Sequence, residues 1–178
     1  MIYYIYAMQL EEAKRKFIEG WGTLGSAWGV SRTMAQVHAL LLVSEGALST
    51  EDIMEQLQIS RGNVNLNVRA LMDWGLVRKE LRPGERREFF SGEKDIHKVA
   101  TLIMKERRRR ELEPIMRVLG EIKQVEPSAT VSEAEARAFS ETIGNIQNFA
   151  ELADRTAATI IKADENWFLS TFMKLMRP

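Results

Sequence analysis

The stretch from Ser49 to Phe90 constrains the fold most, because helical periodicity gives way to a strand pattern within it. Ser49 is a hydroxyl cap with an acid, Asp52, three residues later, which is close to a capping box. Ser60 is placed to cap a second helix. The apolar residues of these helices are Ile53, Leu57 and Ile59 in the first and Val64, Val68 and Leu71 in the second. Two short helices joined by a few residues predict a helix-turn-helix unit.

A change of period follows Gly75, which is placed to end the second helix. The segment Leu76–Leu81 predicts a strand, and Glu88–Phe90 predicts its partner. Between them, Arg82–Glu85 (RPGE) joins a proline to a conformationally permissive glycine, which is typical of a tight turn. The sequence therefore predicts a β-hairpin, a wing, directly behind the helix-turn-helix unit.

Helices are predicted on both sides of this winged unit. A first helix is expected from about Gln9 to Trp28, weakened near its end by glycines, and a second is expected after the cap Ser31. Beyond the wing the prediction is helical from about Asp95 to Gln124. Breaks are predicted at Pro127–Ser128 and Ala163–Asn166, on either side of a long helix that begins with a capping box at Ser132–Glu135.

The predicted fold class is therefore mainly α, a winged helix-turn-helix with a small β-hairpin wing and flanking long dimerisation helices. We expect three segments: an N-terminal dimerisation helix (1–30), a DNA-binding winged domain (31–94) and a C-terminal helical region (95–178) for dimerisation or effector binding. The apolar stripe of the first helix, with Phe17, Trp21 and Leu24, is expected at the dimer interface. The apolar start of the chain reads as a tail before a functional start at Met8.

Composition narrows the functional classes. Lys plus Arg is 25 and Asp plus Glu is 25, so the net charge is zero, and a DNA-binding surface must come from the distribution of charge. The chain has no cysteine, and its two histidines, His38 and His97, lie far apart, so no metal site and no cofactor are predicted. No catalytic motif and no apolar run of about 20 residues is present, which favours a non-enzymatic, cytoplasmic protein.

The second helix of the unit carries side chains suited to the major groove. Asparagine is a weak helix former, yet its amide can bind adenine bidentately, as arginine can bind guanine. A solvated polar face is the alternative interpretation of each asparagine alone. With the basic hairpin directly behind, double-stranded DNA is the expected partner. The predicted DNA-binding residues are Ser60, Arg61, Gly62, Asn63, Asn65, Asn67 and Arg69 on the helix and Arg82, Arg86 and Arg87 on the wing.

These motifs resemble the DNA-binding domain of MarR-type regulators, and within them the GbsR branch. The resemblance covers roughly residues 9 to 125. It is strongest at Ser60–Asn65 (SRGNVN) and Trp74–Val77 (WGLV), and it extends to Pro83–Arg87 (PGERR), to Phe17–Gly22 (FIEGWG) and to the arginine-rich stretch before Glu113-Pro114. It implies a homodimeric regulator of transcription that reads an inverted repeat, and it implies Arg61, Asn63, Asn65, Arg86 and Arg87 as DNA contacts. Some GbsR-like proteins respond to choline, so a small-molecule effector such as choline is a further expectation.

Several other features have competing interpretations. Arg107–Arg110 can touch phosphate, but four consecutive helical residues point in four directions, and we expect ion pairs with nearby glutamates. The tryptophans can form a cage for a quaternary ammonium or simply pack. Leu66, where many MarR-type helices carry a polar residue, can touch a thymine methyl group or pack. The rival function is a winged-helix module for protein–protein contact without sequence-specific DNA binding; a helical enzyme has no motif in its favour.

Overall fold

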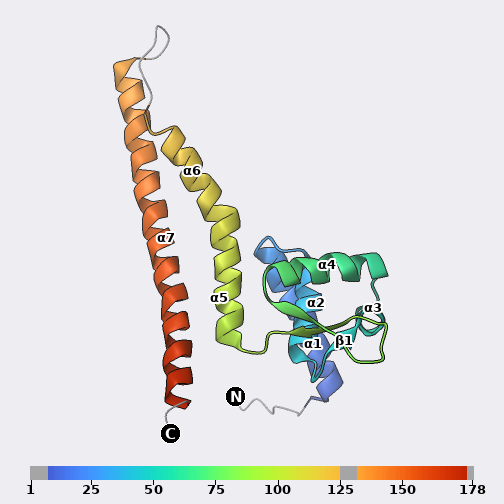
Figure 1. The fold of residues 1–178 in the computed structure, drawn as a ribbon. Coiled ribbons are helices and arrows are strands. Elements are labelled where there is room, and N and C mark those ends of the chain that lie inside the picture. Colours follow the sequence, from blue (N-terminus) through green and yellow to red (C-terminus); the bar gives the residue numbers. More distant parts are fainter. Residues whose placement is uncertain (1–7, 125–131, 176–178) are drawn as a thin grey trace, which may run out of the picture. The chain divides into compact units, whose positions relative to one another are not determined.

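The computed structural model describes residues 8–124 and 132–175, with side chains up to Lys162 in the second range. The chain divides after Val99 into two compact units, which are described separately. The first holds α1 (Leu10–Ala27), α2 (Arg32–Val43), β1 (Leu48–Ser49), α3 (Thr50–Leu57), α4 (Arg61–Asp73), β2 (Val77–Glu80) and β3 (Phe89–Gly92) (Figure 1). The second holds most of α5 (Ile96–Arg107), then η1 (Arg108–Leu112), α6 (Glu113–Glu121) and α7 (Glu133–Leu175).

The predicted helix-turn-helix is confirmed in α3 and α4. Ser49 and Asp52 form a complete capping box at the start of α3, with the Ser49 N–H donating to the Asp52 carboxylate at 2.8 Å. These bonds from Ser49 hold the pKa of Asp52 below its ordinary value. Ser60 caps α4 by accepting from the backbone N–H of Asn63 at 3.3 Å. The inner face of α4 is buried as predicted, at Val64, Val68 and Leu71.

The wing is part of a three-stranded antiparallel sheet with the order β1-β3-β2. The hairpin strands β2 and β3 were predicted, and Gly84 takes the positive φ of 82° that its turn requires. Strand β1 was not predicted, because two residues, of which the second is the helix cap Ser49, carry no recognisable period. It pairs Leu48 with Phe90 and Ser49 with Phe89, and so fixes the base of the wing beside the start of α3.

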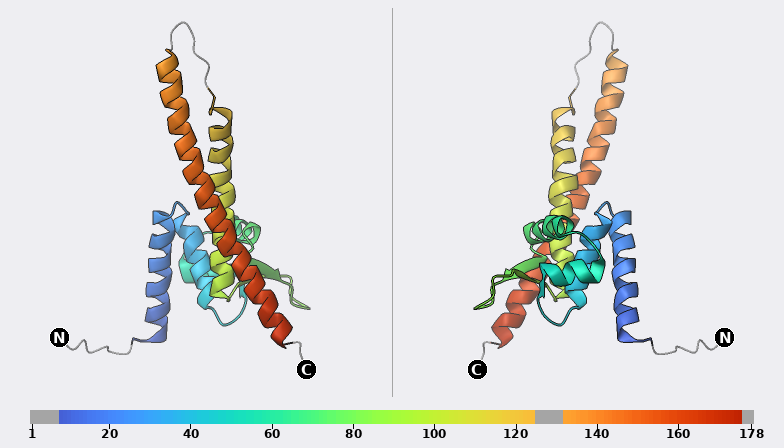
Figure 2. Two further views of the ribbon diagram at one scale, coloured as in Figure 1. Left: turned by 90° about the vertical axis from the view of Figure 1, so that its left-hand side faces the viewer. Right: turned by 90° about the vertical axis from the view of Figure 1, so that its right-hand side faces the viewer.

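Helices α1 and α2 approach each other closely at two glycines. A Cβ atom built on Gly25 would lie 2.5 Å from the Cβ of Ala35, and one on Gly22 would lie 2.7 Å from Gln36 Cγ. The glycines that weaken α1 as an isolated helix therefore let it pack against α2, and Figure 2 shows the two helices side by side. In the same contact Trp21 Nε1 donates to Nδ1 of the buried His38 at 3.3 Å.

Lys94, which follows β3 by two residues, caps the C-terminal end of α2. Its ammonium group donates to the backbone carbonyls of Leu41, Leu42 and Ser44 at 2.8, 2.7 and 2.5 Å. The last carbonyls of a helix have no partner inside the helix. One side chain that follows β3 thus stabilises the C-terminus of α2 and attaches the base of the wing to it.

In the second unit, η1 is a single turn of π-helix between α5 and α6. Arg108 in this turn binds Asp154 of α7, with Nε 2.5 Å from Oδ1, and also lies 3.3 Å from Glu113. Nearby, Leu119 of α6 packs with Ile143 and Ala150 of α7, beside Leu112 and Met116. The ion pair and this small apolar core hold α7 along η1 and α6.

The predicted capping box at Ser132–Glu135 is confirmed, with the Ser132 hydroxyl and N–H both donating to Glu135. The predicted break at Ala163–Asn166 is wrong, because α7 continues to Leu175. That segment contains neither proline nor glycine, so nothing in it interrupts the backbone hydrogen bonds. The predicted break at Pro127–Ser128 and the N-terminal tail lie outside the described residues.

No helix among the described residues has the length and apolar character needed to cross a bilayer.

Candidate DNA-binding surface

The outer face of α4 is set by the burial of its inner face. Opposite Val64 and Val68, steps of four, three and four residues place Gly62, Leu66, Arg69 and Asp73 along one exposed line. Asn63 is exposed on one flank of this line, and Asn65 is half-buried on the other. Ser60, Arg61 and Gly62, all exposed, form the N-terminal turn, where backbone N–H groups attract anions.

Asn67 is the exception among the predicted DNA-binding residues of α4. Only 6% of it is exposed, and its amide Nδ2 donates to the backbone carbonyl of Asn63 at 2.7 Å. It lies on the buried side of the helix because it follows Val64 by three residues. The position of Asn67 in the sequence suggested a base contact, but its side chain stabilises α4 from within, and the surface proposed below omits it.

Arg61 is bound to the neighbouring helix. Its Nη2 lies 2.6 Å from Glu51 Oε1 in the first turn of α3, and both side chains are exposed. The pKa of Glu51 is lowered first by the N–H at the start of α3 and then by the hydrogen bond from Arg61. The sequence gave no sign of this pair, because the two residues belong to different helices. This pair orients Arg61 along α3.

The wing arginines differ in their partners. Arg82 lies over the ring of Phe89, 4.0 Å from its centroid, and donates to the backbone carbonyl of Ala47 at 3.3 Å. Arg87 forms two hydrogen bonds with Glu85, which raise the pKa of its guanidinium. Both guanidinium groups also lie near enough to Asp52 to lower the pKa of its carboxyl. The arginines at the base of the wing therefore lie close to the acidic first turn of α3 and interact with it electrostatically.

Two of the predicted arginines have side chains without a bonding partner among the described residues. Within residues 8–124 and 132–162, neither Arg69 nor Arg86 has a hydrogen bond or ion pair, and both are exposed. One belongs to the outer line of α4 and the other to the tip of the hairpin. Figure 1 shows α3, α4 and the hairpin as neighbours in the first unit, which agrees with the contacts between α3 and α4 and between α4 and β2. A helix with exposed polar side chains next to a basic hairpin is the geometry of a winged-helix DNA reader.

Comparison with known proteins supports this geometry. Residues 28–88 match the model of the MarR family. The chain carries a MarR-like winged helix. A crystal structure described as that of a transcriptional regulator aligns with 86% of this chain and 99% of its own, with a TM-score of 0.62 and 15% identity, and so has the same fold. A crystal structure of MarR aligns with 82% of this chain and 96% of its own at 17% identity, but its TM-score of 0.37 is too low to support an argument. A comparison with curated protein sequences finds no match.

Outside the MarR-like winged helix, the arginine-rich stretch is occupied by ion pairs, as predicted. Arg107 pairs with Glu111, Arg108 with Asp154 and Glu113, and both Arg109 and Arg110 with the buried Glu106. The hydrogen bond from Arg109 lowers the pKa of Glu106. All four arginines form ion pairs within the second unit, and Arg108 links η1 to α7, so they are not part of the candidate surface.

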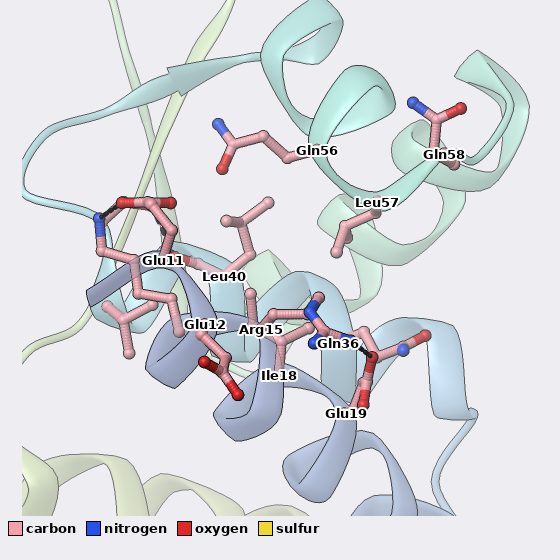
Figure 3. Close-up of a pocket in the computed structure, with 13 residues that line it drawn as sticks. Glu11, Glu12, Arg15, Ile18, Glu19, Gln36, Leu40, Gln56, Leu57 and Gln58 are labelled. Carbon is pink, nitrogen blue, oxygen red and sulfur yellow. Dashed lines mark hydrogen bonds and ion pairs between the residues drawn. The ribbon is translucent and has the colours of Figure 1, made fainter. Parts of the chain in front are cut away.

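A hollow of about 620 Å³ lies between α1, α2 and α3 on the same winged unit (Figure 3). Its walls carry the carboxylates Glu11, Glu12 and Glu19, each of which forms an ion pair with a lysine or arginine of α1. Its lining contains no aromatic side chain, so it is not an aromatic cage. Within the described part of the chain, no three His, Asp or Glu side chains come together in a way that could hold a metal ion.

The tryptophans weighed as a cage have other surroundings. Trp21 lies against Phe17 and His38, Trp74 is buried, and Trp28 is half exposed at the end of α1. The side chain of Trp167 is outside the described residues. Of the stripe predicted for dimerisation, Phe17 and Trp21 are half-buried and Trp21 bonds to α2, whereas Leu24 is exposed.

Proposed function

We propose that this protein is a sequence-specific, double-stranded DNA-binding transcriptional regulator that acts in the cytoplasm as a homodimer on an inverted-repeat operator. The observation that carries the proposal is the outer line of α4, where Arg69 and the flanking Asn63 and Asn65 face outward beside a hairpin that carries Arg86. The described fold uses none of the outward groups of Arg69 and Arg86, so they are available to DNA.

The surface divides the two tasks of DNA binding between its parts. Amide and guanidinium groups on a helix in the major groove can bond to base edges and select a sequence. The arginine at the wing tip, together with the N–H groups at Ser60–Gly62, can bond to phosphates, which positions the protein without selecting a sequence. Asn65 and Arg69 are therefore proposed as base contacts, and Arg86 is proposed as a phosphate contact. Arg61, Arg82 and Arg87 are proposed as further DNA contacts. Each of these three is already bonded to another residue of the chain, and it must give up that bond or keep it alongside the contact with DNA.

The test is selection of binding sites from random double-stranded DNA, followed by affinity measurements on the enriched site and on unrelated DNA. Asn65→Ala and Arg69→Ala are expected to reduce binding to the enriched site by about 1–3 kcal/mol each and to change binding to unrelated DNA far less. Arg117→Ala, an exposed arginine of α6, is the matched control. Failure to enrich any sequence would favour a winged helix that binds protein, and equal losses on both DNAs would leave only phosphate contact.

The homodimer is proposed because the second unit exposes large apolar side chains to solvent. On α7, Phe139, Ile146 and Ile160 recur at multiples of seven residues and are about half exposed, and Phe149 beside them is 72% exposed. On α6 and its C-cap, Ile115, Val118 and Ile122 form a second exposed apolar row. Patches of this kind on helices are typical of association surfaces. A second copy of the chain is the proposed occupant, with Leu24 of α1 adding to the interface.

Sedimentation tests the association. The wild type should sediment as a dimer at micromolar concentration, and Phe149→Glu should shift it toward monomer because a buried charge without a partner is costly. Arg137→Glu, an exposed position on the other side of α7, is the control and should leave the dimer intact. A monomeric wild type with full operator affinity would contradict the proposal.

A small-molecule effector such as choline is proposed on the resemblance to the GbsR branch. The proposal names no site, because the hollow of Figure 3 lacks aromatic side chains and its carboxylates are already paired. A thermal-shift screen of choline, glycine betaine and small aromatic acids, repeated with operator DNA, tests it. A ligand that raises the melting temperature and leaves operator affinity unchanged would contradict regulation, since an effector must prefer one of two states.

A further inference from the structure

Leu66 occupies the middle of the outer line of α4 and remains in water. Its exposed fraction is 69%, although Val64 and Val68, two residues away on either side, are fully buried. A leucine gains free energy when its side chain leaves water, and the chain does not provide that burial. The outer line of α4 therefore holds one large apolar side chain where the rest of the line is glycine, arginine and aspartate.

Gly62 lies one turn before Leu66 on the same face. A Cβ atom built there would meet only the Ser60 hydroxyl, at 3.9 Å, so the fold itself leaves room for a side chain. Glycine in a helix interior is less favourable than alanine by about 1 kcal/mol, and Gly62, the second residue of α4, carries part of that cost. The chain's own packing does not require this glycine, and its lack of a side chain leaves the backbone of α4 open to a partner just in front of Leu66.

The surroundings of Leu66 indicate the chemistry of that partner. Asn63, Asn65 and Arg69 present hydrogen-bond donors on its flanks and one turn beyond it. In the major groove, an A·T pair presents acceptors and a donor next to one apolar group, the C5-methyl group of thymine. A protein partner is a poorer match, because the centres of protein interfaces are built from clusters of apolar and aromatic residues and are poor in charge.

We propose that Leu66 contacts the C5-methyl group of a thymine in each half-site, and that Gly62 allows the base-pair edge to come close enough for this contact. Leu66 would thus determine one T·A pair of the operator without forming a hydrogen bond. The inference rests on the proposed function, since it requires α4 to lie in the major groove.

The experiment removes the methyl group alone. In the DNA site enriched from random sequence, each thymine is replaced in turn by deoxyuridine, which keeps every hydrogen-bonding group, and the affinity of the full-length protein is measured. At one symmetric pair of positions, the replacement should weaken binding by roughly fourfold per methyl group, the value for one buried carbon. The same replacement elsewhere should have little effect.

Protein variants then assign the effect to a side chain. Leu66→Ala, which changes an exposed position, should bind the thymine and deoxyuridine sites equally well. Leu81→Ala removes an even more exposed leucine at the end of β2 and should keep the wild-type preference for thymine. Thermal melting of both variants checks that the fold is retained.

Each outcome bears on one of the two proposals. If no DNA site is enriched, the proposed function fails. If a site is enriched but no deoxyuridine position weakens binding, the Leu66 contact is wrong and the proposed function stands. A Leu66→Ala protein that binds every DNA as the wild type does would also overturn the contact, and it would point to a protein partner for this leucine.

Discussion

In the first unit, Ile53 of α3 and Val64, Val68 and Leu71 of α4 are fully buried, whereas in the second unit the large apolar side chains of α7 divide between a packed face and an exposed one. The winged unit also closes its helix ends, through the Ser49, Ser60 and Lys94 bonds. A unit whose core is buried and whose helix ends are capped within the chain does not need a partner for these stabilising contacts. Helices that leave a second apolar face in water would gain further stabilisation from the association proposed above.

The largest expected effect compares one isoleucine from each unit. Ile53 of α3 has no exposed surface, so Ile53→Ala should destabilise the protein by about 2–5 kcal/mol at any protein concentration. Ile146 of α7 is 46% exposed, so Ile146→Ala should matter mainly through the proposed dimer, with a melting temperature that depends less strongly on protein concentration than that of the wild type. Thermal melting over a hundredfold concentration range measures both. Equal concentration dependence in the two variants would break the comparison.

The second prediction is that the winged unit loses stability in acid, because it contains the buried His38. Burial lowers the pKa of this imidazole to about 4, from 6.5 in the unfolded chain. Below pH 6.5 the unfolded chain binds a proton that the folded chain does not. Stability should therefore be complete above pH 6.5 and should fall by about 3 kcal/mol as the pH drops to 4.

Urea unfolding at several pH values, followed by tryptophan fluorescence, to which the adjacent Trp21 contributes, measures this loss. His38→Gln removes the titration and offers Trp21 a neutral acceptor, so its stability should vary less between pH 6.5 and 4. His97→Gln, at an exposed position, is the control and should keep the wild-type profile. An unchanged acid limb in His38→Gln would show that other groups cause it.

A third and smaller effect, on the free energy of unfolding, tests whether α1 packs tightly against α2. Gly25→Ala places a methyl group against Ala35, which has no flexible end to move, and should destabilise by about 1–3 kcal/mol. Gly20→Ala meets nothing within 4 Å and should stabilise the helix by about 0.5–1 kcal/mol. Opposite signs in chemical unfolding are the expected result. A stabilising Gly25→Ala would mean that α1 lies loosely on α2.

The smallest effect distinguishes arginines within the wing. Arg86→Ala should reduce the salt dependence of DNA binding by about one unit, because its guanidinium has no partner among the described side chains. Arg87→Ala also releases the carboxylate of Glu85, which repels phosphate, so it should weaken binding more than Arg86→Ala does. Affinities at several salt concentrations give both slopes. Identical results for the two variants would show that the Glu85 pair has no role in binding.

The parts of the fold that sequence predicted are those encoded locally. Caps at Ser49 and Ser60, the stop at Gly75 and the hairpin turn at Gly84 each rest on a few neighbouring residues, and all are confirmed. The site was predicted as a set of residue types on α4 and the wing. The burial of Asn67 could have been derived from the sequence, because it follows Val64 by three residues and precedes Leu71 by four, and both were predicted on the inner face of α4.

The features that sequence missed depend on residues distant along the chain. Strand β1 exists because β3 lies beside it, and the Arg61–Glu51 pair joins two helices. The glycines of α1 looked like defects because their packing partner, Ala35, belongs to α2. The predicted break in α7 is an error of the opposite kind, because an end was expected where no proline or glycine disrupts the helix.

The bonds of Lys94 to the end of α2 also have a consequence for folding kinetics. They join positions 50 to 53 residues apart, so they close a loop that contains β1, α3, α4 and the hairpin. Closing a loop of this length costs chain entropy, and contacts so distant in sequence form after the local helices. Interactions that are absent from the folding transition state act mainly on the unfolding rate. Lys94 should therefore set how long the winged unit stays folded, with little influence on how fast it folds.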